Sequence, residues 1–263
     1  IGVVLLLLSW IVAGGHILRH GRSLDARMVS AWIAPLFFAG PMMSRDLYSY
    51  LMQSTLARDD INPYQHGAAA NPGPILFEVS ADWRNTTTPY GPLHLWIGEL
   101  VTGLVGDNVA AGVAAYKVLS LLGFITIAWS IPRIASKLGA DPAVALWLGV
   151  ANPVIILHLI GGMHNESLMV GLVSIGLLAA LNRHFHAALI LVGTAVAMKA
   201  TAVIAAPFIV WMMLHYYAPK GSSKWRSLFV FVLSGLTALV EIIAAVALIT
   251  WISGTSWGWL SQV

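Results

Sequence analysis

The sequence contains no cysteine and few charged residues. Without cysteine the chain has no disulfides, no thiol nucleophile and no thiolate-bound metal. Charged residues make up 10% of the 263 residues, whereas a soluble domain carries about 25%. Hydrophobic residues reach 58%, and the mean hydropathy is +0.80. This composition predicts an integral membrane protein, and the net charge of +3 gives no indication of nucleic-acid binding.

Nucleotide-binding and hydrolase motifs are also missing. The sequence has no P-loop, no Rossmann glycine pattern, no G-x-S-x-G and no H-E-x-x-H. Its short polar linkers are too small to form a nucleotide-binding domain. Any driving energy must therefore come from the substrate itself or from an ion gradient. We expect no cofactor and no metal, because His164 and Glu166 alone do not make a ligand set.

Apolar runs long enough to cross a membrane occur throughout the chain. A span needs about 20 apolar residues, or about 17 at the shortest. Basic residues concentrate in four short linkers, and the positive-inside rule places these in the cytoplasm and the polar stretch 44–94 outside. The predicted spans are residues 1–18, 28–43, 109–131, 142–160, 167–181 and 227–250. The basic residues are Arg19, Arg22, Arg27, Arg133, Lys137, Arg183, Lys220, Lys224 and Arg226.

Two regions fit this topology less simply. Residues 93–107 carry Glu99 and Asp107, which favours an interfacial helix over a span. Residues 187–215 lie between two basic linkers, which indicates two short half-spans that meet near Lys199. A single long tilted helix is the alternative. Because the chain starts within an apolar run, we expect residues 1–263 to be a segment of a longer protein that forms one membrane module.

The loop 44–94 holds nearly half of the acidic residues of the chain. Asp46 follows Ser44 at a predicted helix start, so it is either a capping acid near the helix dipole or a carboxylate that accepts a proton at the membrane boundary. Arg45 adds a cation near any phosphate, and Tyr48 and Tyr50 add rings for sugar stacking. Asp82 is expected either to serve the sugar site or simply to form an ion pair with Arg84. Tyr90 precedes Gly91-Pro92, a rigid turn that would aim its ring into a cavity.

Three ionisable residues lie at or within the membrane further along the chain. His164 and Glu166 stand in GGMHNE between two apolar runs, where they either cap a helix or serve a function. Lys199 lies inside the apolar segment AVAMKATAV. It either snorkels, pairs with Glu166 or Glu241, or provides a counter-charge for a phosphate. Lys117 is nearer the outer end of its span, where snorkelling suffices.

In combination, SRDLYSY, TPYGPL, GGMHNESLMVGL and MKATAVIAAPF resemble the polyprenyl-phosphate-mannose-dependent glycosyltransferases of the GT-C architecture. The likeness is greatest to the actinobacterial α-(1→6)-mannopyranosyltransferases of lipomannan and lipoarabinomannan synthesis. The resemblance implies a GT-C-like transmembrane helix bundle in the plasma membrane. Because members of that family are longer, it also implies that residues 1–263 are an N-terminal portion. It also implies an inverting reaction outside the cytoplasm, from polyprenyl-phosphate mannose to a mannan or lipomannan acceptor.

The resemblance also implies roles for particular residues. Asp46 would act as general base on the acceptor hydroxyl. His164 and Lys199, with Arg45, would bind the leaving phosphate. The sugar and acceptor pocket would be shaped by Tyr48, Tyr90, Glu166 and Asp82.

Two other functions remain open on the sequence. A secondary transporter would explain Glu241, Lys199 and a broken helix, since half-helices can bind ions at mid-membrane. It would not explain an outer loop of this length and polarity. A non-catalytic membrane subunit is the third possibility.

Overall fold

The computed structural model describes residues 1–262, and every regular element in this range is a helix. The helices are α1 (Gly2–His20), α2 (Ala26–Phe38), α3 (Asp46–Arg58), α4 (Pro92–Val105), α5 (Val109–Lys137), α6 (Pro142–Gly149), α7 (Pro153–Ile156), α8 (Glu166–Leu181), α9 (Phe185–Met198), α10 (Ala206–Tyr217) and α11 (Lys224–Ile252). A π-helical turn, Leu157–Gly161, continues α7. The 3-10 turns are Ala68–Ala70, Pro74–Glu78, Ala81–Trp83, Ala200–Ala205 and Trp257–Ser261.

The all-helical polytopic architecture predicted from the sequence is confirmed. Four helical segments are long and apolar enough to cross a membrane: α1, α5, the continuous stretch 200–217 and α11. A fifth forms if α6 and the segment after it count as one span bent by 54°. The bend falls before Pro153, where proline disfavours helical backbone at the preceding residue. The shorter apolar helices are α2, α4, α8 and α9.

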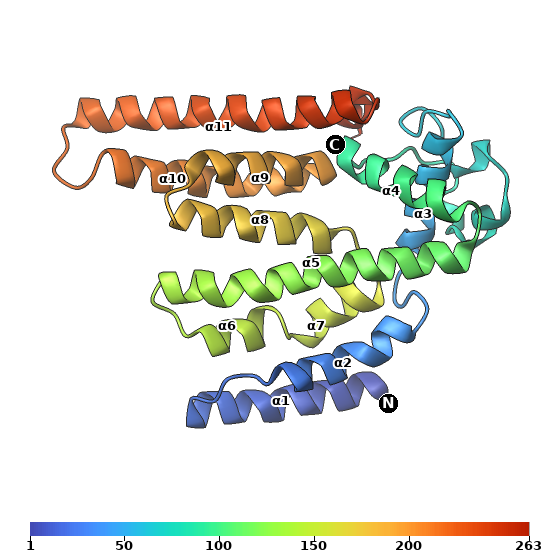
Figure 1. Cartoon of the computed structure of the whole chain (residues 1–263), viewed down its shortest axis with the longest axis horizontal. Coiled ribbons are helices and arrows are strands. Elements are labelled where there is room, and N and C mark those ends of the chain that lie inside the picture. The colour runs from blue at the N-terminus through green and yellow to red at the C-terminus, as the bar shows by residue number, and fades with distance from the viewer. Residues whose placement is uncertain (263) are drawn as a thin grey trace.

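The long helices run side by side, and α3 and α4 lie together at one end of them (Figure 1). We call this end of the bundle the loop end. The linkers α1–α2, α5–α6, α8–α9 and α10–α11 lie at the opposite end (Figure 1). The nine basic residues of the four linkers all belong to these turns or to the helix ends beside them. The four basic linkers and the polar loop 44–94 therefore lie at opposite ends of the bundle.

The chain reverses direction at Lys199, as the prediction of two half-spans requires. Helix α9 ends at Met198, and Lys199 has extended backbone, with φ −155° and ψ 128°. The Ala200–Ala205 turn and α10 then lead back towards the basic end (Figure 1). The alternative of one long tilted helix is wrong. The reversal places Lys199 at the loop end rather than in mid-bundle.

Close helix packing fixes the start of α8. A Cβ on Gly123 of α5 would lie 2.5 Å from the Ser167 carbonyl carbon and oxygen, so only glycine permits this approach. Gly171 of α8 in turn faces the Gly123 carbonyl oxygen. The first turn of α8, which carries Glu166, is therefore held directly against α5.

Lys117 does not snorkel, and the prediction that it does is wrong. Its side chain in α5 is buried, and Nζ donates to the carbonyl oxygens of Leu36 at 2.6 Å and Ile160 at 2.9 Å. Both carbonyls belong to the last turns of helical segments, where oxygens lack intrahelical partners and the dipole favours a cation. Lys117 therefore joins the ends of α2 and the π-helical turn.

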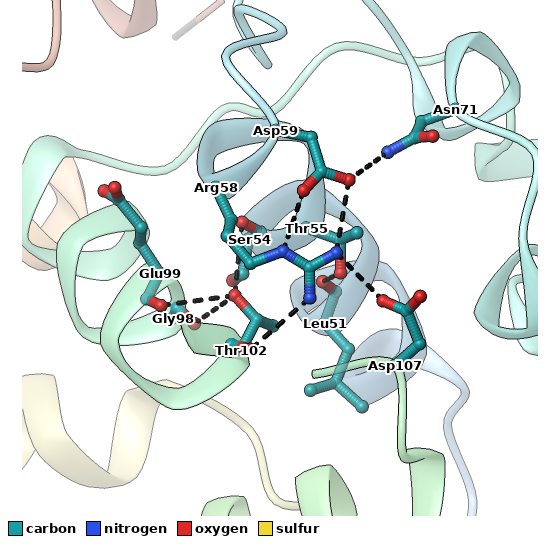
Figure 2. Close-up of polar contacts among 10 residues, drawn as sticks. All are labelled: Leu51, Ser54, Thr55, Arg58, Asp59, Asn71, Gly98, Glu99, Thr102 and Asp107. Carbon is teal, nitrogen blue, oxygen red and sulfur yellow. Dashed lines mark hydrogen bonds and ion pairs between the residues drawn. The ribbon is translucent and has the colours of Figure 1, made fainter. Parts of the chain in front are cut away.

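Arg58 fixes the geometry of the loop end (Figure 2). Its guanidinium contacts Asp59 at 2.8 Å, Asp107 at 2.9 Å and the Thr102 carbonyl at 3.4 Å. Asn71 donates to Asp59 at 2.8 Å. The end of α3, the end of α4 and the intervening loop thus share one polar cluster. The predicted interfacial helix over 93–107 is present as α4, and it packs against α3.

Candidate active site at the loop end

Asp46 is the first residue of α3, so it lies in the first turn, beside the helix N-terminus. Ser44 Oγ accepts a hydrogen bond from the Asp46 backbone N–H at 3.0 Å. The Asp46 carboxylate is close to the helix N-terminus, where the dipole favours negative charge. Its side chain is 35% exposed, and it lines a pocket of about 210 Å³. The carboxylate is therefore both a helix-start acid and an accessible one.

One face of α3 forms a wall of this pocket. Asp46, Ser49, Tyr50 and Gln53 line it at spacings of three, four and seven residues, which place them on one helix face. The opposite wall consists of Trp83, Thr86, Thr87, Pro89, Tyr90 and Gln262. The helical spacing is a signal in the sequence that would have found Ser49 and Gln53, neither of which was predicted.

Next to Asp46 lies a row of ionisable side chains from separate parts of the bundle. His164 Nδ1 is 3.5 Å from Asp46 Oδ2 and 3.9 Å from Glu166 Oε2. Lys199 Nζ donates to Glu166 Oε1 at 2.5 Å. Lys199 thus pairs with Glu166, one of its two predicted partners. The structure brings together Asp46, His164, Glu166 and Lys199, all predicted site residues, and we call them the charged cluster.

Aromatic rings pack beside the charged cluster. The Tyr50 ring lies edge-on to Tyr90 at 5.3 Å and to His94 at 4.9 Å. Lys199 Nζ is 5.4 Å from the Tyr90 ring centroid, within range of a cation–π interaction. Burial raises the pKa of the Tyr90 phenol to about 12, so its hydroxyl stays protonated at neutral pH. The prediction that the turn aims Tyr90 into a cavity is confirmed, because Tyr90 lines the pocket.

Three predicted site residues point elsewhere. Arg45 pairs with Glu78 at 2.9 Å, and both side chains are about half exposed. The Arg45 guanidinium lies 5.7 Å from the Tyr48 ring, so Tyr48 faces that ion pair, while Tyr50 faces the pocket. Asp82 is exposed beside Trp83. The expected Asp82–Arg84 pair is absent from residues 1–262, because Arg84 instead donates to the carbonyls of Val79 and Phe77.

His94 and Asn165 were given no role on the sequence, although His94 ends the loop 44–94 and Asn165 stands in GGMHNE. Asn165 Nδ2 donates to His94 Nδ1 at 3.2 Å, and both side chains are buried. Burial, with the nearby Lys199 charge, lowers the pKa of His94 to about 3, so the ring is neutral. Only the tertiary structure brings His94 against Asn165. Within residues 1–262, no three His, Asp or Glu side chains converge to hold a metal ion.

The site pairs a proton acceptor with a nearby cation. Asp46 offers a carboxylate to a hydroxyl in the pocket, and Lys199 offers an ammonium group with donors left over after its bond to Glu166. Such a pair suits displacement of an anionic leaving group. The fold and the site together define a polytopic membrane protein with acid–base residues gathered at one end of its helix bundle.

Comparison with known proteins identifies the family. Residues 1–215 match the family model for the α-(1→6)-mannopyranosyltransferase N-terminal domain. The whole chain is 51% identical to α-(1→6)-mannopyranosyltransferase A of Corynebacterium glutamicum, covering 57% of that protein. It is 38% identical to α-(1→6)-mannopyranosyltransferase A of Mycobacterium tuberculosis, covering 51% of it. The chain therefore belongs to the α-(1→6)-mannopyranosyltransferase family.

The chain spans about half the length of these curated relatives. A more distant relative is a probable α-(1→6)-mannopyranosyltransferase of Mycolicibacterium smegmatis, 33% identical over 98% of the chain and 51% of that protein. No solved structure matches the chain.

Proposed function

We propose that this chain is part of a membrane enzyme that transfers mannose from polyprenyl-phosphate mannose to a mannan or lipomannan acceptor. The new bond would be α-(1→6), as in the names of the relatives. The observation that carries the proposal is the contact of Asp46 with His164 beside the Lys199–Glu166 pair, at the edge of a pocket of about 210 Å³. A base and a phosphate-binding cation are the two groups that this transfer needs.

Asp46 is the general base in this proposal. Inversion requires a base on the side of the sugar opposite the leaving group. Asp46 would take the proton of the acceptor 6-hydroxyl as that oxygen attacks the anomeric carbon of mannose. The bond from that carbon to the phosphate oxygen breaks, and the polyprenyl phosphate leaves with the electron pair. General base catalysis of this kind contributes about 10²- to 10⁴-fold.

Lys199 and His164 stabilise the leaving phosphate. Charge develops on the departing phosphate oxygen, and a fixed cation at that position lowers the barrier most. Glu166 holds Lys199 by one hydrogen bond, and Tyr90 lies against the same ammonium group. The two contacts restrict where the cation can go before the donor binds.

The pocket residues suggest a revised set of sugar contacts. Tyr50, Gln53 and Tyr90 line the pocket, whereas Tyr48, Asp82 and Glu166 do not. We therefore assign the sugar contacts to Tyr50, Gln53 and Tyr90. Arg45 would reach a donor phosphate only by leaving Glu78, at little cost because exposed ion pairs contribute about 0–1 kcal/mol.

The proposed reaction takes place on the outer side of the plasma membrane. The four basic linkers lie at the end of the bundle opposite the loop end. The positive-inside rule favours a cytoplasmic position for such linkers. The pocket then opens to the outer surface, where a lipid-linked donor needs no nucleotide.

The test is a transfer assay with the full-length protein in membranes. Polyprenyl-phosphate mannose labelled in the sugar and a short α-(1→6) mannoside are supplied, and the product is analysed for linkage and anomeric configuration. We expect an α-(1→6) product from the lipid-linked donor and none from a nucleotide-linked mannose. Transfer from the nucleotide donor alone, or uptake of substrate without a new glycosidic bond, would overturn the proposal.

A further inference from the structure

A small internal cavity lies between α4, α5, α8 and the end of α9. Its volume is about 10 Å³, which is close to the space that one water molecule needs. Five side chains with polar atoms line it: His94, Tyr116, Ser120, Asn165 and Ser167. All are at least nine-tenths buried, with exposed fractions between 1% and 6%. Met163 and Met198 are among the apolar residues that complete the wall.

Four of these side chains have one buried atom that makes no hydrogen bond within residues 1–262. These atoms are His94 Nε2, Tyr116 Oη, Asn165 Oδ1 and Ser167 Oγ. Buried polar atoms in proteins are nearly always hydrogen-bonded, either to protein or to ordered water. Four such atoms on residues around a single water-sized space point to a common partner rather than to separate defects.

The His94–Asn165 contact determines the polarity of these atoms. The Asn165 amide nitrogen only donates, so His94 Nδ1 must accept, and the proton of the neutral ring is on Nε2. His94 Nε2 is therefore a donor, and Asn165 Oδ1 is an acceptor. Ser167 Oγ can do either. A water can accept from His94 Nε2 and donate to Asn165 Oδ1 and Ser167 Oγ, and its second acceptor site is left for the Tyr116 hydroxyl.

The Asn165 side chain does not cap α8. It is the N-cap residue of α8, a position where asparagine normally bonds the backbone of the first turn. Its side chain makes no such bond and turns to His94 instead. His164 and Glu166, on either side of Asn165, are members of the charged cluster. The hydrogen bond from Asn165 to His94 therefore fixes the turn that holds both.

We propose that the cavity binds one ordered water and that His94 is a positioning residue, which with this water fixes Asn165 and so the placement of His164 and Glu166. This inference rests on the proposed function only for its effect on catalysis. The water itself is a property of the fold. A misplacement of catalytic groups by about 1 Å can cost 10²-fold in rate, so the turn matters although His94 touches no substrate.

Two variants separate the contributions of His94 in the full-length protein. His94→Asn can place an amide oxygen where Nδ1 accepts from Asn165, whereas His94→Leu has no polar atom. We expect His94→Leu to lower kcat for mannose transfer by about tenfold to a hundredfold, with the KM for the lipid-linked donor within about twofold of the wild type. His94→Asn should recover most of kcat. A His94→Leu variant with wild-type kcat, or no difference between the two variants, would overturn the positioning role.

The water has a readout that is independent of activity. X-ray radiolysis converts ordered water into hydroxyl radicals that label adjacent side chains, which mass spectrometry detects. Met163 is fully buried and lines the cavity, whereas Met213 is also buried but does not line it. We expect Met163 in the wild type to be labelled severalfold more than Met213. Equal labelling would overturn the water site, even if the transfer assay succeeds.

Ser167→Ala provides the second variant if His94→Leu does not fold. It removes one partner of the water and leaves the His94–Asn165 bond in place. We expect Met163 labelling to fall at least twofold in this variant, while thermal unfolding stays near the wild type. Unchanged Met163 labelling would contradict the assignment of Ser167 as a partner. Failure of transfer in the wild type would count against the proposed function and would leave the labelling result intact.

Discussion

Gly91 donates its backbone N–H to the carbonyl oxygen of Met198 at 3.1 Å. The bond joins the end of the 44–94 loop to the last residue of α9. Tyr90 precedes Gly91 and Lys199 follows Met198, and the Lys199 ammonium lies 5.4 Å from the Tyr90 ring centroid. One backbone hydrogen bond thus holds Tyr90, which lines the pocket, near the Lys199 ammonium group.

Replacement of Gly91 should disrupt this junction. A Cβ at Gly91 would lie 2.2 Å from the Ala197 carbonyl oxygen, so the loop or the end of α9 must move. We expect Gly91→Ala to lower both the transfer rate, by at least about tenfold, and the melting temperature. Gly103→Ala in α4 is the matched control, because a Cβ there meets open space. The control should be neutral or stabilising by up to about 1 kcal/mol. Equal transfer rates and melting temperatures for the two variants would show that the contact between Gly91 and the end of α9 does not matter.

The Lys199–Glu166 pair allows structure and catalysis to be separated. Lys199→Met leaves the Glu166 carboxylate without its partner in a site about a third exposed. We expect a loss of about 1–2 kcal/mol in stability, between the values for exposed and buried pairs. We also expect a loss of transfer of about 10²-fold or more, as for other groups that stabilise developing charge.

The double variant Lys199→Met with Glu166→Gln tests whether Lys199 acts in transfer itself or only neutralises Glu166. It removes both charges, so thermal unfolding should return towards the wild type while transfer stays low. Recovery of transfer together with stability would mean that Lys199 serves only to neutralise Glu166. Lys199→Arg, which keeps the charge, should unfold like the wild type and retain more transfer than Lys199→Met.

The Arg58 cluster should make the stability of the loop end sensitive to acid. The hydrogen bond from Arg58 lowers the pKa of Asp59 below its usual value of 3.8. A lowered pKa in the folded state gives stability that is complete above the unfolded pKa and is lost as the pH falls through the folded pKa. The stability advantage of wild type over Asp59→Asn should therefore be constant from about pH 7 to 5 and shrink below about pH 4.

Thermal unfolding in detergent, followed across this pH range, measures the difference. Asp60→Asn is the neighbouring control, because Asp60 is exposed and forms no ion pair within residues 1–262. Its left-handed backbone, with φ 59°, is one that asparagine adopts readily. A pH-independent difference for Asp59→Asn would show that Arg58 does not stabilise its charged form.

Membrane topology can be measured directly because residues 1–263 contain no cysteine. Single cysteines at Asn85 in the loop and at Lys220 in a basic linker occupy exposed positions. In whole cells, with any cysteine elsewhere in the protein replaced, a membrane-impermeant maleimide should label Asn85→Cys. It should label Lys220→Cys only after the cells are opened. The reverse pattern would place the pocket on the cytoplasmic side.

The sequence predicted the helical path well because hydrophobic length and basic linkers report on the membrane directly. It located Asp46, His164, Glu166 and Lys199, since an ionisable group is conspicuous among apolar residues. It was wrong about Lys117, because no pattern shows which buried carbonyls a lysine will meet. It missed His94, whose partner Asn165 is brought to it only by tertiary packing. It offered both Tyr48 and Tyr50 as sugar-stacking rings, because both are aromatic and only the helix orientation shows that Tyr50 lines the pocket.

The most direct test of the account is the transfer rate of Asp46→Asn in the full-length protein. The substitution keeps the size of the side chain and its place at the start of α3 but removes the proton acceptor. We expect transfer from polyprenyl-phosphate mannose to fall by about 10²- to 10⁴-fold, with donor binding retained and with Asp60→Asn near the wild type. Wild-type transfer by Asp46→Asn would contradict the central claim that Asp46 is the base.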